Sequence, residues 1–302
     1  MNSYLDLARQ GKTTWRHYAL AVVLILFLWQ ILGAIPSAFL ILWVWLDGKP
    51  QTDVTSSGQF IGVDPNLGFV MPMLGSVLFL IGIFLAIHFI HQRPIRTLVT
   101  PASHGSWGRF FQGFAVWFIL LGLMSLVEVL LYPGRYTWTL NLHYFVPFVF
   151  LAILLIPLQT SAEELFFRGY ILQGVGLRLR NIWLLSAISG FLFMMPHLLN
   201  PEARVNYPLM GFYYFFIGPV MAYITLRDGR LELALGLHSA NNLFSALLAN
   251  YTGSVMPTPS LYTINTLDAV YSVSAAFIGL VVFVFVFTGP FRRTARGENN
   301  AG

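Results

Sequence analysis

Residues 144–168, YFVPFVFLAILLIPLQTSAEELFFR, decide how this chain folds. The stretch is uncharged until it closes with Glu163, Glu164 and Arg168. About 20 apolar residues suffice for a helix to cross a bilayer, so the stretch predicts a membrane-spanning helix. Ionisable groups inside such a helix are costly and are usually retained for function. We therefore expect a functional site on this helix.

The whole composition is that of a polytopic membrane protein. Apolar residues make up 57% of the 302 residues and charged residues only 10%, where soluble domains average about 25% charged. The basic balance, with a sequence pI near 9.6, fits basic residues held on the cytoplasmic side better than it fits nucleic acid. The chain has no cysteine, which excludes disulfides, thiolate catalysis and cysteine-ligated metals.

Eight apolar segments have the length of spanning helices, and we predict an all-α membrane bundle of eight transmembrane helices. They lie at about 18–46, 67–90, 110–132, 144–167, 182–199, 209–226, 232–250 and 269–290. The first is too long for the apolar region of a cleaved signal peptide, so we expect it to be retained. The predicted organisation is a cytoplasmic N-terminal segment at 1–17, a membrane domain at 18–290 and a cytoplasmic tail at 291–302.

Basic residues fall mainly on one side of this predicted bundle. With the N-terminus inside, 14 of the 17 lysines and arginines, Arg168 among them, lie in cytoplasmic segments, and only Lys49, Arg135 and Arg204 lie outside. The positive-inside rule therefore places both termini in the cytoplasm, and we expect a bacterial inner (plasma) membrane. The segment Gly169–Asn181 mixes apolar and basic residues, which predicts that it lies at the cytoplasmic interface.

The two adjacent glutamates have different helical neighbours. Residues four apart share a face of a helix, so Glu164 can pair with Arg168. Glu163 lies about 100° away, beside Phe166 and Phe167. An arginine partner favours the ionised carboxylate and desolvation disfavours it, so we expect Glu164 to hold structure and Glu163 to be a general base. An ion pair at a helix end, with no catalytic role, is the plainer alternative.

Two later apolar segments carry histidines. Phe193 lies four residues before His197, on the same helical face, where its ring can cover one side of the imidazole. His238 and Asn242 are likewise four apart, and two hydrogen-bonding groups on one face suit stabilisation of an oxyanion. Taken singly, each has a plainer interpretation. His197 would be a residue at the membrane interface, and His238 with Asn242 a hydrogen-bonded contact between helices.

Together these residues resemble the three motifs of the CPBP family, which comprises the type II CAAX prenyl endopeptidases, the bacterial Abi proteins and the bacteriocin-processing proteases. The motifs are Glu163-Glu164-x-x-x-Arg168, Phe193-x-x-x-His197 and His238-x-x-x-Asn242, in this order on the fourth, fifth and seventh predicted helices. The resemblance covers about residues 145–250, the expected catalytic core. Each motif alone is a weak signal, but three in order on separate membrane helices are a strong one.

The resemblance implies an intramembrane endopeptidase of the glutamate type. Its catalytic residues would be, in chain order, Glu163, Glu164, Arg168, His197, His238 and Asn242. By this resemblance Glu163 would activate a water with help from His197. His238 and Asn242 would stabilise the oxyanion, and the Glu164–Arg168 pair would hold the site in shape.

A zinc-dependent mechanism is the alternative for the same residues. Glu163, His197 and His238 have the side chains of three zinc ligands. No HExxH pairing is present in the sequence, and Asn242 is a poor ligand but a good oxyanion donor. We therefore expect a mechanism with no metal and no other cofactor.

Functions of two other classes compete with proteolysis. A non-catalytic binder, such as an immunity or chaperone-like protein, need not keep Glu163 and both histidines. A proton-coupled transporter would use Glu163 and His238 as a relay, and it predicts an inverted repeat and broken helices, which the sequence does not show. For a peptidase, the expected partners are membrane lipid and a membrane-associated or lipidated peptide, with no nucleic acid.

The predicted spans leave one conflict in depth. At 1.5 Å per residue, Glu163 lies about 28 Å from the outer end of its helix, whereas His197 lies about 22 Å from the inner end of the next one. The two groups would then sit near opposite faces of the bilayer. The conflict disappears if the fifth helix begins below the bilayer, if the fourth is tilted and extends past it, or if the helix bounds differ from those predicted, and the sequence does not decide among these.

Overall fold

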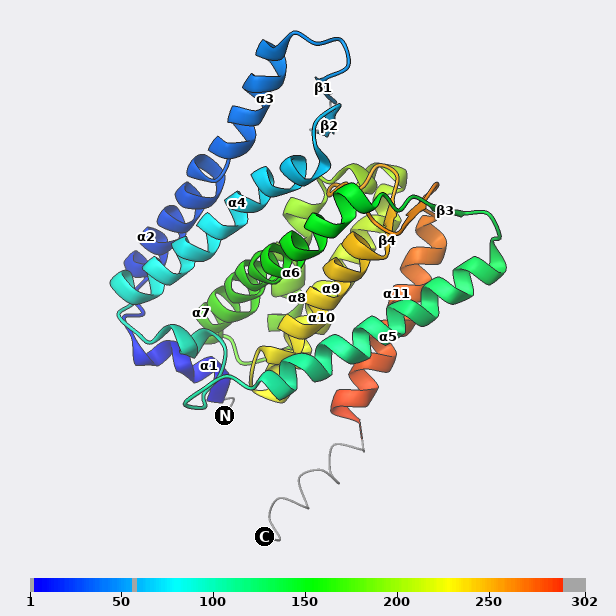
Figure 1. The fold of residues 1–302 in the computed structure, drawn as a ribbon. Helices are drawn as coiled ribbons and strands as arrows, with labels where there is room; N and C mark the ends of the chain where they lie inside the picture. The colour runs from blue at the N-terminus through cyan, green and yellow to red at the C-terminus, as the bar shows by residue number, and fades with distance from the viewer. Residues whose placement is uncertain (1–2, 56–58, 290–302) are drawn as a thin grey trace.

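The computed structural model describes residues 3–55 and 59–289 and is nearly all helical (Figure 1). Among these residues, six helices are long and apolar enough to cross a membrane. Their bounds are Trp15–Asp47, Pro65–Ile90, Trp107–Leu131, Leu142–Gly176, Tyr207–Asp228 and Ala269–Thr288. Two shorter helices, α8 (Ile182–His197) and α10 (Glu232–Leu247), occupy the positions of the other two predicted spans. The predicted helical bundle is present, and six of its helices have the length of a span.

Several of the long helices are assembled from successive segments. The first consists of α2 (Trp15–Leu26), the π-helical η2 (Phe27–Leu32) and α3 (Ile35–Asp47), and α4 (Pro65–Leu85) runs into the π-helical η3 (Ala86–Ile90). The fourth span comprises α6 (Leu142–Glu164), the π-helical η5 (Leu165–Ile171) and α7 (Leu172–Gly176). The remaining three are α5 (Trp107–Leu131), α9 (Tyr207–Asp228) and α11 (Ala269–Thr288). Because π-helical turns are rare and are frequent at functional sites, η5 directly after Glu164 marks this region.

The helices begin where the sequence supplies a cap. Asp64 Oδ1 accepts hydrogen bonds from the backbone N–H groups of Asn66 (2.8 Å) and Leu67 (3.3 Å) at the start of α4. Side chains of the same kind cap α5, α6, α8, α9 and α11, namely Ser106, Asn141, Asn181, Asn206 and Asp268. Each satisfies a backbone donor that the first turn of a helix leaves without a partner. The caps explain why these helices start within a few residues of the predicted positions.

The described residues also contain five short strands, which the all-α prediction missed. β3 (Tyr136–Trp138) pairs antiparallel with β5 (Tyr262–Ile264), which pairs in parallel with β4 (Ala249–Tyr251). β1 (Asp53–Val54) and β2 (Phe60–Ile61) form a second, antiparallel pair. All of them lie at the end of the bundle away from α1 (Figure 1). They are too short for the alternation of side chains along a strand to stand out in the sequence.

α8 and α9 pack closely because two glycines face each other. A Cβ on Gly190 would lie 2.1 Å from Cδ of Pro219, and a Cβ on Gly218 would lie 2.4 Å from Cα of Gly190. Neither position has room for a side chain. Small residues that let two backbones approach are a usual basis of helix packing in membranes. This contact places the end of α8, and with it His197, against α9, where the rings of His197 and Tyr214 have centroids 4.9 Å apart.

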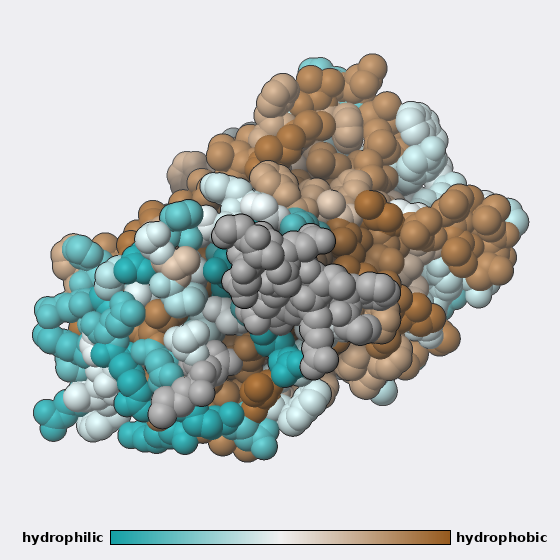
Figure 2. All heavy atoms as spheres, turned by 90° about the horizontal axis from the view of Figure 1, so that it is seen from below, coloured by the Kyte–Doolittle hydropathy of each residue, from teal (hydrophilic) through white to brown (hydrophobic). Residues whose placement is uncertain are grey.

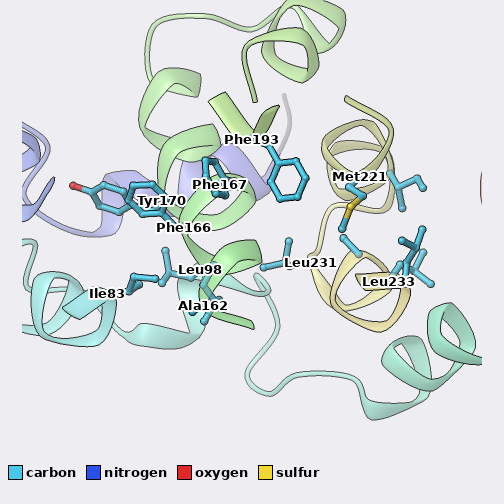
Figure 3. Close-up of a cluster of buried hydrophobic side chains, with 14 of the residues drawn as sticks. Ile83, Leu98, Ala162, Phe166, Phe167, Tyr170, Phe193, Met221, Leu231 and Leu233 are labelled. Carbon is cyan, nitrogen blue, oxygen red and sulfur yellow. The ribbon is translucent and has the colours of Figure 1, made fainter. Parts of the chain in front are cut away.

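The core of the bundle is rich in aromatic side chains. Figure 3 shows Phe166, Phe167 and Tyr170 of η5 within a cluster of buried apolar side chains from several helices. The ring of Phe167 meets that of Phe193 edge to face, with centroids 5.4 Å apart. Edge-to-face contacts of this kind are favoured by the charge distribution of aromatic rings. The cluster follows Glu163 and Glu164 along the chain, so it lies between these glutamates and the end of the bundle that carries α1.

The N-terminal segment is packed into the bundle. α1 (Ser3–Asp6) and η1 (Leu7–Gln10) bury Tyr4 fully, and its hydroxyl donates to the carbonyl oxygen of Leu98 at 2.6 Å, in η4 (Ile95–Leu98). Burial raises the pKa of this hydroxyl, so it remains a neutral donor at pH 7. Arg93 donates to Oε1 of Gln173 (2.8 Å), and the amide of Gln173 donates to the carbonyl oxygen of Thr97 (2.7 Å). These contacts close the bundle at this end.

The structure corrects two predictions for this end of the molecule. Residues 169–181 do not all lie at the interface, because η5 and α7 continue α6 and Gln173 is fully buried. Arg168 does not belong to the basic surface, since it is also fully buried, and Arg93 is only 3% exposed. A mixture of polar and apolar residues suggests a segment at the interface. The same mixture fits a buried helix equally well when each polar group has a buried partner.

The other predicted cytoplasmic basic residues still gather at the end that carries α1. Those that the structure describes are Arg9, Lys12, Arg16, Arg96, Arg109, Arg178, Arg180, Arg227 and Arg230. Figure 2 views this end and shows hydrophilic residues over part of it, with hydrophobic surface around them. The predicted tail at 291–302 lies outside the described residues. The basic end and the strand-bearing end of the bundle are therefore opposite each other.

Candidate active site

The fourth span places Glu163 well inside the bundle because the helix does not end there. After Glu164 it continues through η5 and α7 to Gly176, whereas α8 is short and ends at His197. Glu163 and His197 consequently line the same cavity. The conflict in depth between these two groups disappears because the fourth helix continues beyond Glu164 to Gly176, one of the solutions that the sequence leaves open.

Glu164 is the buried centre of a hydrogen-bonded cluster. Its side chain and that of Arg168 are both 0% exposed, and Nη1 of Arg168 donates to Oε1 of Glu164 at 2.8 Å. The predicted ion pair is thus present. His238 Nδ1 lies 2.7 Å from the same oxygen. An ionised carboxylate only accepts hydrogen bonds, so His238 donates its Nδ1–H, and this fixes which ring nitrogen faces away from Glu164.

Arg168 is held by further contacts that the sequence does not reveal. Its guanidinium carbon lies 4.3 Å from the ring centroid of Phe193, close enough for a cation–π interaction. Its Nη2 donates weakly to the carbonyl oxygen of Gly218, at 3.5 Å. The arginine therefore links three elements, because it lies in η5, Phe193 lies in α8 and Gly218 lies in α9.

Glu163 has a different environment, as its sequence neighbours predict. Its Oε1 accepts a hydrogen bond of 2.6 Å from Nε2 of Gln159, one helical turn earlier. Its Oε2 lies 3.6 Å from Nε2 of His238 and has no hydrogen-bond partner among the described residues. The side chain of Glu163 is 17% exposed, against 0% for Glu164. One glutamate is therefore bound by a cation and fully buried, and the other lines the cavity with part of its side chain exposed.

His197 lies between two aromatic rings at the end of α8. Its ring is 4.3 Å from that of Phe193 on one side and 4.9 Å from that of Tyr214 on the other, measured between centroids. Its Nδ1 lies 2.7 Å from the carbonyl oxygen of Phe193, which accepts the hydrogen bond. Nε2 is then the nitrogen left for other partners. Glu163 is near enough to act on His197 electrostatically, although no hydrogen bond joins them among the described residues.

Asn242 joins the site through Gln159. Its Nδ2 donates to Oε1 of Gln159 at 3.0 Å, so Gln159 connects the amide to Glu163. Since an amide nitrogen carries two hydrogens, the second remains available to a substrate. Asn241 instead accepts a hydrogen bond of 3.2 Å from Nε1 of Trp117. The hydroxyls of Thr160 and Ser239, 2.9 Å apart and buried, fix α6 against α10 close by.

Sequence reasoning missed Gln159, Trp117 and Tyr214. Gln159 stands four residues before Glu163, so the helical spacing that paired Glu164 with Arg168 could have identified it. Trp117 and Tyr214 reach the site from α5 and α9, far from the motifs along the chain. No short-range spacing points to them.

Four of the six candidate residues, Glu163, His197, His238 and Asn242, line one cavity of about 1000 Å³, and Glu164 and Arg168 are buried outside its lining. Among its lining residues are Gln159, Glu163, Phe193, His197, His238, Asn241 and Asn242. A concave, largely apolar site with a few converging polar groups is the usual form of an active site. Its size leaves room for a peptide segment and a water molecule next to Glu163.

The possible zinc ligands do not form a ligand set in this arrangement. Within residues 3–55 and 59–289, no group of three or more histidine, aspartate, glutamate or cysteine side chains is placed to hold a metal ion. The hydrogen bonds at Nδ1 of His238 and His197 leave Nε2 of each ring free, so the misfit lies in the placement of the side chains and not in the ring nitrogens. The residues therefore do not fit a tetrahedral zinc site as they stand.

Comparisons with known proteins agree with the motifs. The family model described as "Type II CAAX prenyl endopeptidase Rce1-like" matches residues 142–244. A curated relative, "Uncharacterized protein YyaK" of Bacillus subtilis (strain 168), is 33% identical over 267 residues, which are 88% of this chain and 88% of the relative. No solved structure matches the chain significantly.

The family match spans the region in which the three motifs lie, from the start of α6 to Phe244 of α10. It confirms the resemblance drawn from Glu163, His197 and His238 and their motif partners. Together with the apolar helices, it identifies a multi-pass membrane protein of a protease family. The chain belongs to the CPBP family of intramembrane proteases, and it is similar to the Rce1-like type II CAAX prenyl endopeptidases over residues 142–244.

Proposed function

We propose that this protein is an intramembrane endopeptidase in which Glu163 activates the attacking water. The observation that carries the proposal is the difference between the two glutamates. Glu164 is fully buried and bound by Arg168 and His238, whereas Glu163 lines the cavity with a side chain that is 17% exposed. A general base must reach the proton that it removes, and only Glu163 meets this requirement.

In this mechanism a water molecule lies beside Oε2 of Glu163. The carboxylate takes one of its protons while the water oxygen adds to the carbonyl carbon of the scissile peptide. His197, whose Nε2 is left free by the bond to Phe193, assists by orienting the water. The proton then passes to the leaving amine as the C–N bond breaks, which yields one carboxylic acid and one amine.

The oxyanion that forms on the carbonyl oxygen needs hydrogen-bond donors within reach. Asn242 supplies its second amide hydrogen, and His238, when protonated, supplies Nε2–H. Donors fixed in place before the reaction stabilise developing charge without having to reorganise. Gln159 positions Asn242 relative to Glu163, and the buried Glu164–Arg168 pair positions His238.

We further propose that all eight helices cross a bacterial plasma membrane with both termini in the cytoplasm. The gathering of basic residues at the end that carries α1 supports this orientation. The substrate would be a membrane-associated or lipidated peptide or protein. No metal or other cofactor takes part in the proposed steps, and no nucleic acid is a partner.

The test is a comparison of peptide termini in cells that make the wild-type protein or Glu163→Gln at equal abundance. Membrane and secreted fractions of the wild type should contain new termini that the variant lacks. Glu232→Gln is the matched control, because Glu232 is a buried glutamate outside the cavity, where it accepts a hydrogen bond from the backbone N–H of Ser106. Termini that persist in Glu163→Gln would refute the role of Glu163, and termini lost in both variants would indicate a general effect on folding.

A further inference from the structure

The cavity at Glu163 extends in only one direction. Its lining includes residues between Pro65 and Ser76 of α4 and between Tyr271 and Ala276 of α11. Both segments lie toward the strand-bearing ends of their helices. It also includes residues of the loops at 59–65 and 249–259. The loops at the opposite, basic end, residues 91–106, 177–181 and 228–231, are all described and contribute no lining residue.

Exposure along the cavity follows the same direction. Asp64, Val255 and Pro257 line it at the strand-bearing end and are exposed, whereas Glu163 and His238 at its bottom have side chains only 17% and 9% exposed. The rim is therefore at the loops between helices and the catalytic groups are at the closed end.

Below the catalytic groups the bundle is sealed. Phe166, Phe167 and Tyr170 follow the glutamates and are buried (Figure 3). Beyond them, His91 contacts the hydroxyl of Tyr170 at 2.9 Å, and the buried Tyr4 donates to Leu98. A peptide that came from the basic end would have to displace this packed layer.

The charge of the lining has one sign. Among the residues that the structure describes, the ionisable side chains that line the cavity, apart from histidines and tyrosines, are Asp64, Glu128, Glu163 and Glu202, with no lysine or arginine. Glu128 is neutralised by Arg135 at 2.8 Å. Glu202 is 5% exposed and accepts hydrogen bonds from the hydroxyl of Tyr214 (3.0 Å) and the backbone N–H of Val255 (3.1 Å), both neutral donors. A cleft lined by one sign of charge concentrates ligands of the other sign.

We propose that the substrate enters from the face opposite the basic one, the outer face of the membrane, and that it is a neutral or positively charged peptide segment. The bond that is cut then belongs to a part of the substrate that lies outside the cytoplasm or in the outer half of the bilayer. This inference rests on the proposed peptidase function for its substrate, but the direction of access can be measured without any cleavage.

Single cysteines test the direction cleanly because the chain has none of its own. Ser245→Cys in α10 and Ser272→Cys in α11 place a thiol in the cavity wall outside the catalytic groups. Thr137→Cys marks the exposed strand-bearing end, and Ser103→Cys marks an exposed loop at the basic end. The probe is a membrane-impermeant maleimide added to intact cells.

We expect both cavity cysteines and Thr137→Cys to react in intact cells, and Ser103→Cys to react only after the membrane is opened. Cavity cysteines that react only after the membrane is opened, as Ser103→Cys does, would overturn the inference. Cavity cysteines that react from neither side would also overturn it. Labelling that follows the expectation without any Glu163-dependent cleavage would refute the peptidase function and leave the direction of access standing.

The charge of the substrate is tested with a cationic and an anionic impermeant thiosulfonate. We compare the rate of the cationic reagent divided by that of the anionic reagent at each cysteine. This ratio should be about 10-fold higher at Ser245→Cys than at Thr137→Cys, the lower end of the effect of a charged cleft. Glu202→Gln should reduce this preference, whereas Glu232→Gln at the other end of the bundle should not. Equal ratios at the two cysteines would overturn the preference for a neutral or positive segment.

Discussion

At the scale of single residues, the site depends on the different surroundings of two neighbouring carboxylates, Glu163 and Glu164. Glu164 is bound by a cation and a histidine and is not exposed, so it serves as the fixed partner of Arg168. Glu163 has a glutamine on one oxygen and no hydrogen-bond partner on the other among the described residues, and it lines the cavity. This division of roles follows from a single helical step of about 100° between adjacent side chains.

The first prediction concerns the buried pair. Arg168→Ala leaves Glu164 without its cation, and removal of one member of a buried pair costs about 3–5 kcal/mol. We expect low abundance in membranes and a lower unfolding temperature in detergent. The double variant Glu164→Gln with Arg168→Met should recover abundance relative to Arg168→Ala, since Gln still accepts from His238. No recovery would mean that the charge pair is not what makes the single change harmful.

The second prediction concerns Asn242 and the absence of a metal step. Asn242→Ala should lower the cleavage rate by about 10²–10³-fold, as loss of one oxyanion donor does elsewhere. Asn242→Asp should be at least as damaging, because it places a negative charge next to the developing oxyanion. Strong chelators should leave the wild-type rate unchanged. An active Asn242→Asp enzyme that requires added zinc would contradict the mechanism and favour metal-assisted hydrolysis.

At the scale of elements, the sequence predicts the helices well and their relative depth poorly. The apolar runs and the capping side chains, such as Asp64 and Asn181, locate the helix ends because both act within a few residues. The continuation of α6 into η5 and α7 has no such signal, because Gln173 looks like a surface residue until its buried partners, Arg93 and Thr97, are known. The depth of Glu163 relative to His197 therefore required the structure.

The third prediction concerns the α8–α9 contact that positions His197. Gly190→Ala forces a Cβ within 2.1 Å of Pro219, so the helices must separate. Overpacking of this kind costs about 1–3 kcal/mol, and we expect a lower unfolding temperature together with reduced activity. Gly122→Ala is the matched control, since its Cβ would meet nothing closer than 4.0 Å. Equal stability of the two variants would show that α8 can shift without consequence.

At the scale of the whole molecule, the structure has two unlike ends. One end carries α1, most of the basic residues and the packed layer around Tyr4, and the other carries the short strands and the rim of the cavity (Figure 1). The charge asymmetry could be read from the sequence. The closure of one end could not, because it depends on contacts such as Tyr4 with Leu98 and His91 with Tyr170, about 80 or more residues apart.

The fourth prediction concerns orientation. Reporter fusions after Gln92 and after Arg296 should read cytoplasmic, and fusions near Gly134 and Thr258 should read external, as the distribution of basic residues requires. One crossing more or fewer than predicted before any of these positions would reverse the reading there and the later readings. A cytoplasmic reading at Thr258 would contradict both the eight-helix topology and the outer location of the cavity rim.

The most direct measurement of the central claim is the rate of peptide hydrolysis by the purified protein in lipid vesicles. The peptide would be taken from the cleavage sites found in cells, and the wild type, Glu163→Gln and Glu232→Gln would be compared at equal folded concentration. Loss of the general base should lower the rate of Glu163→Gln by about 10²–10⁴-fold, with Glu232→Gln close to the wild type. A Glu163→Gln rate near that of the wild type would contradict the proposal that this carboxylate activates the water.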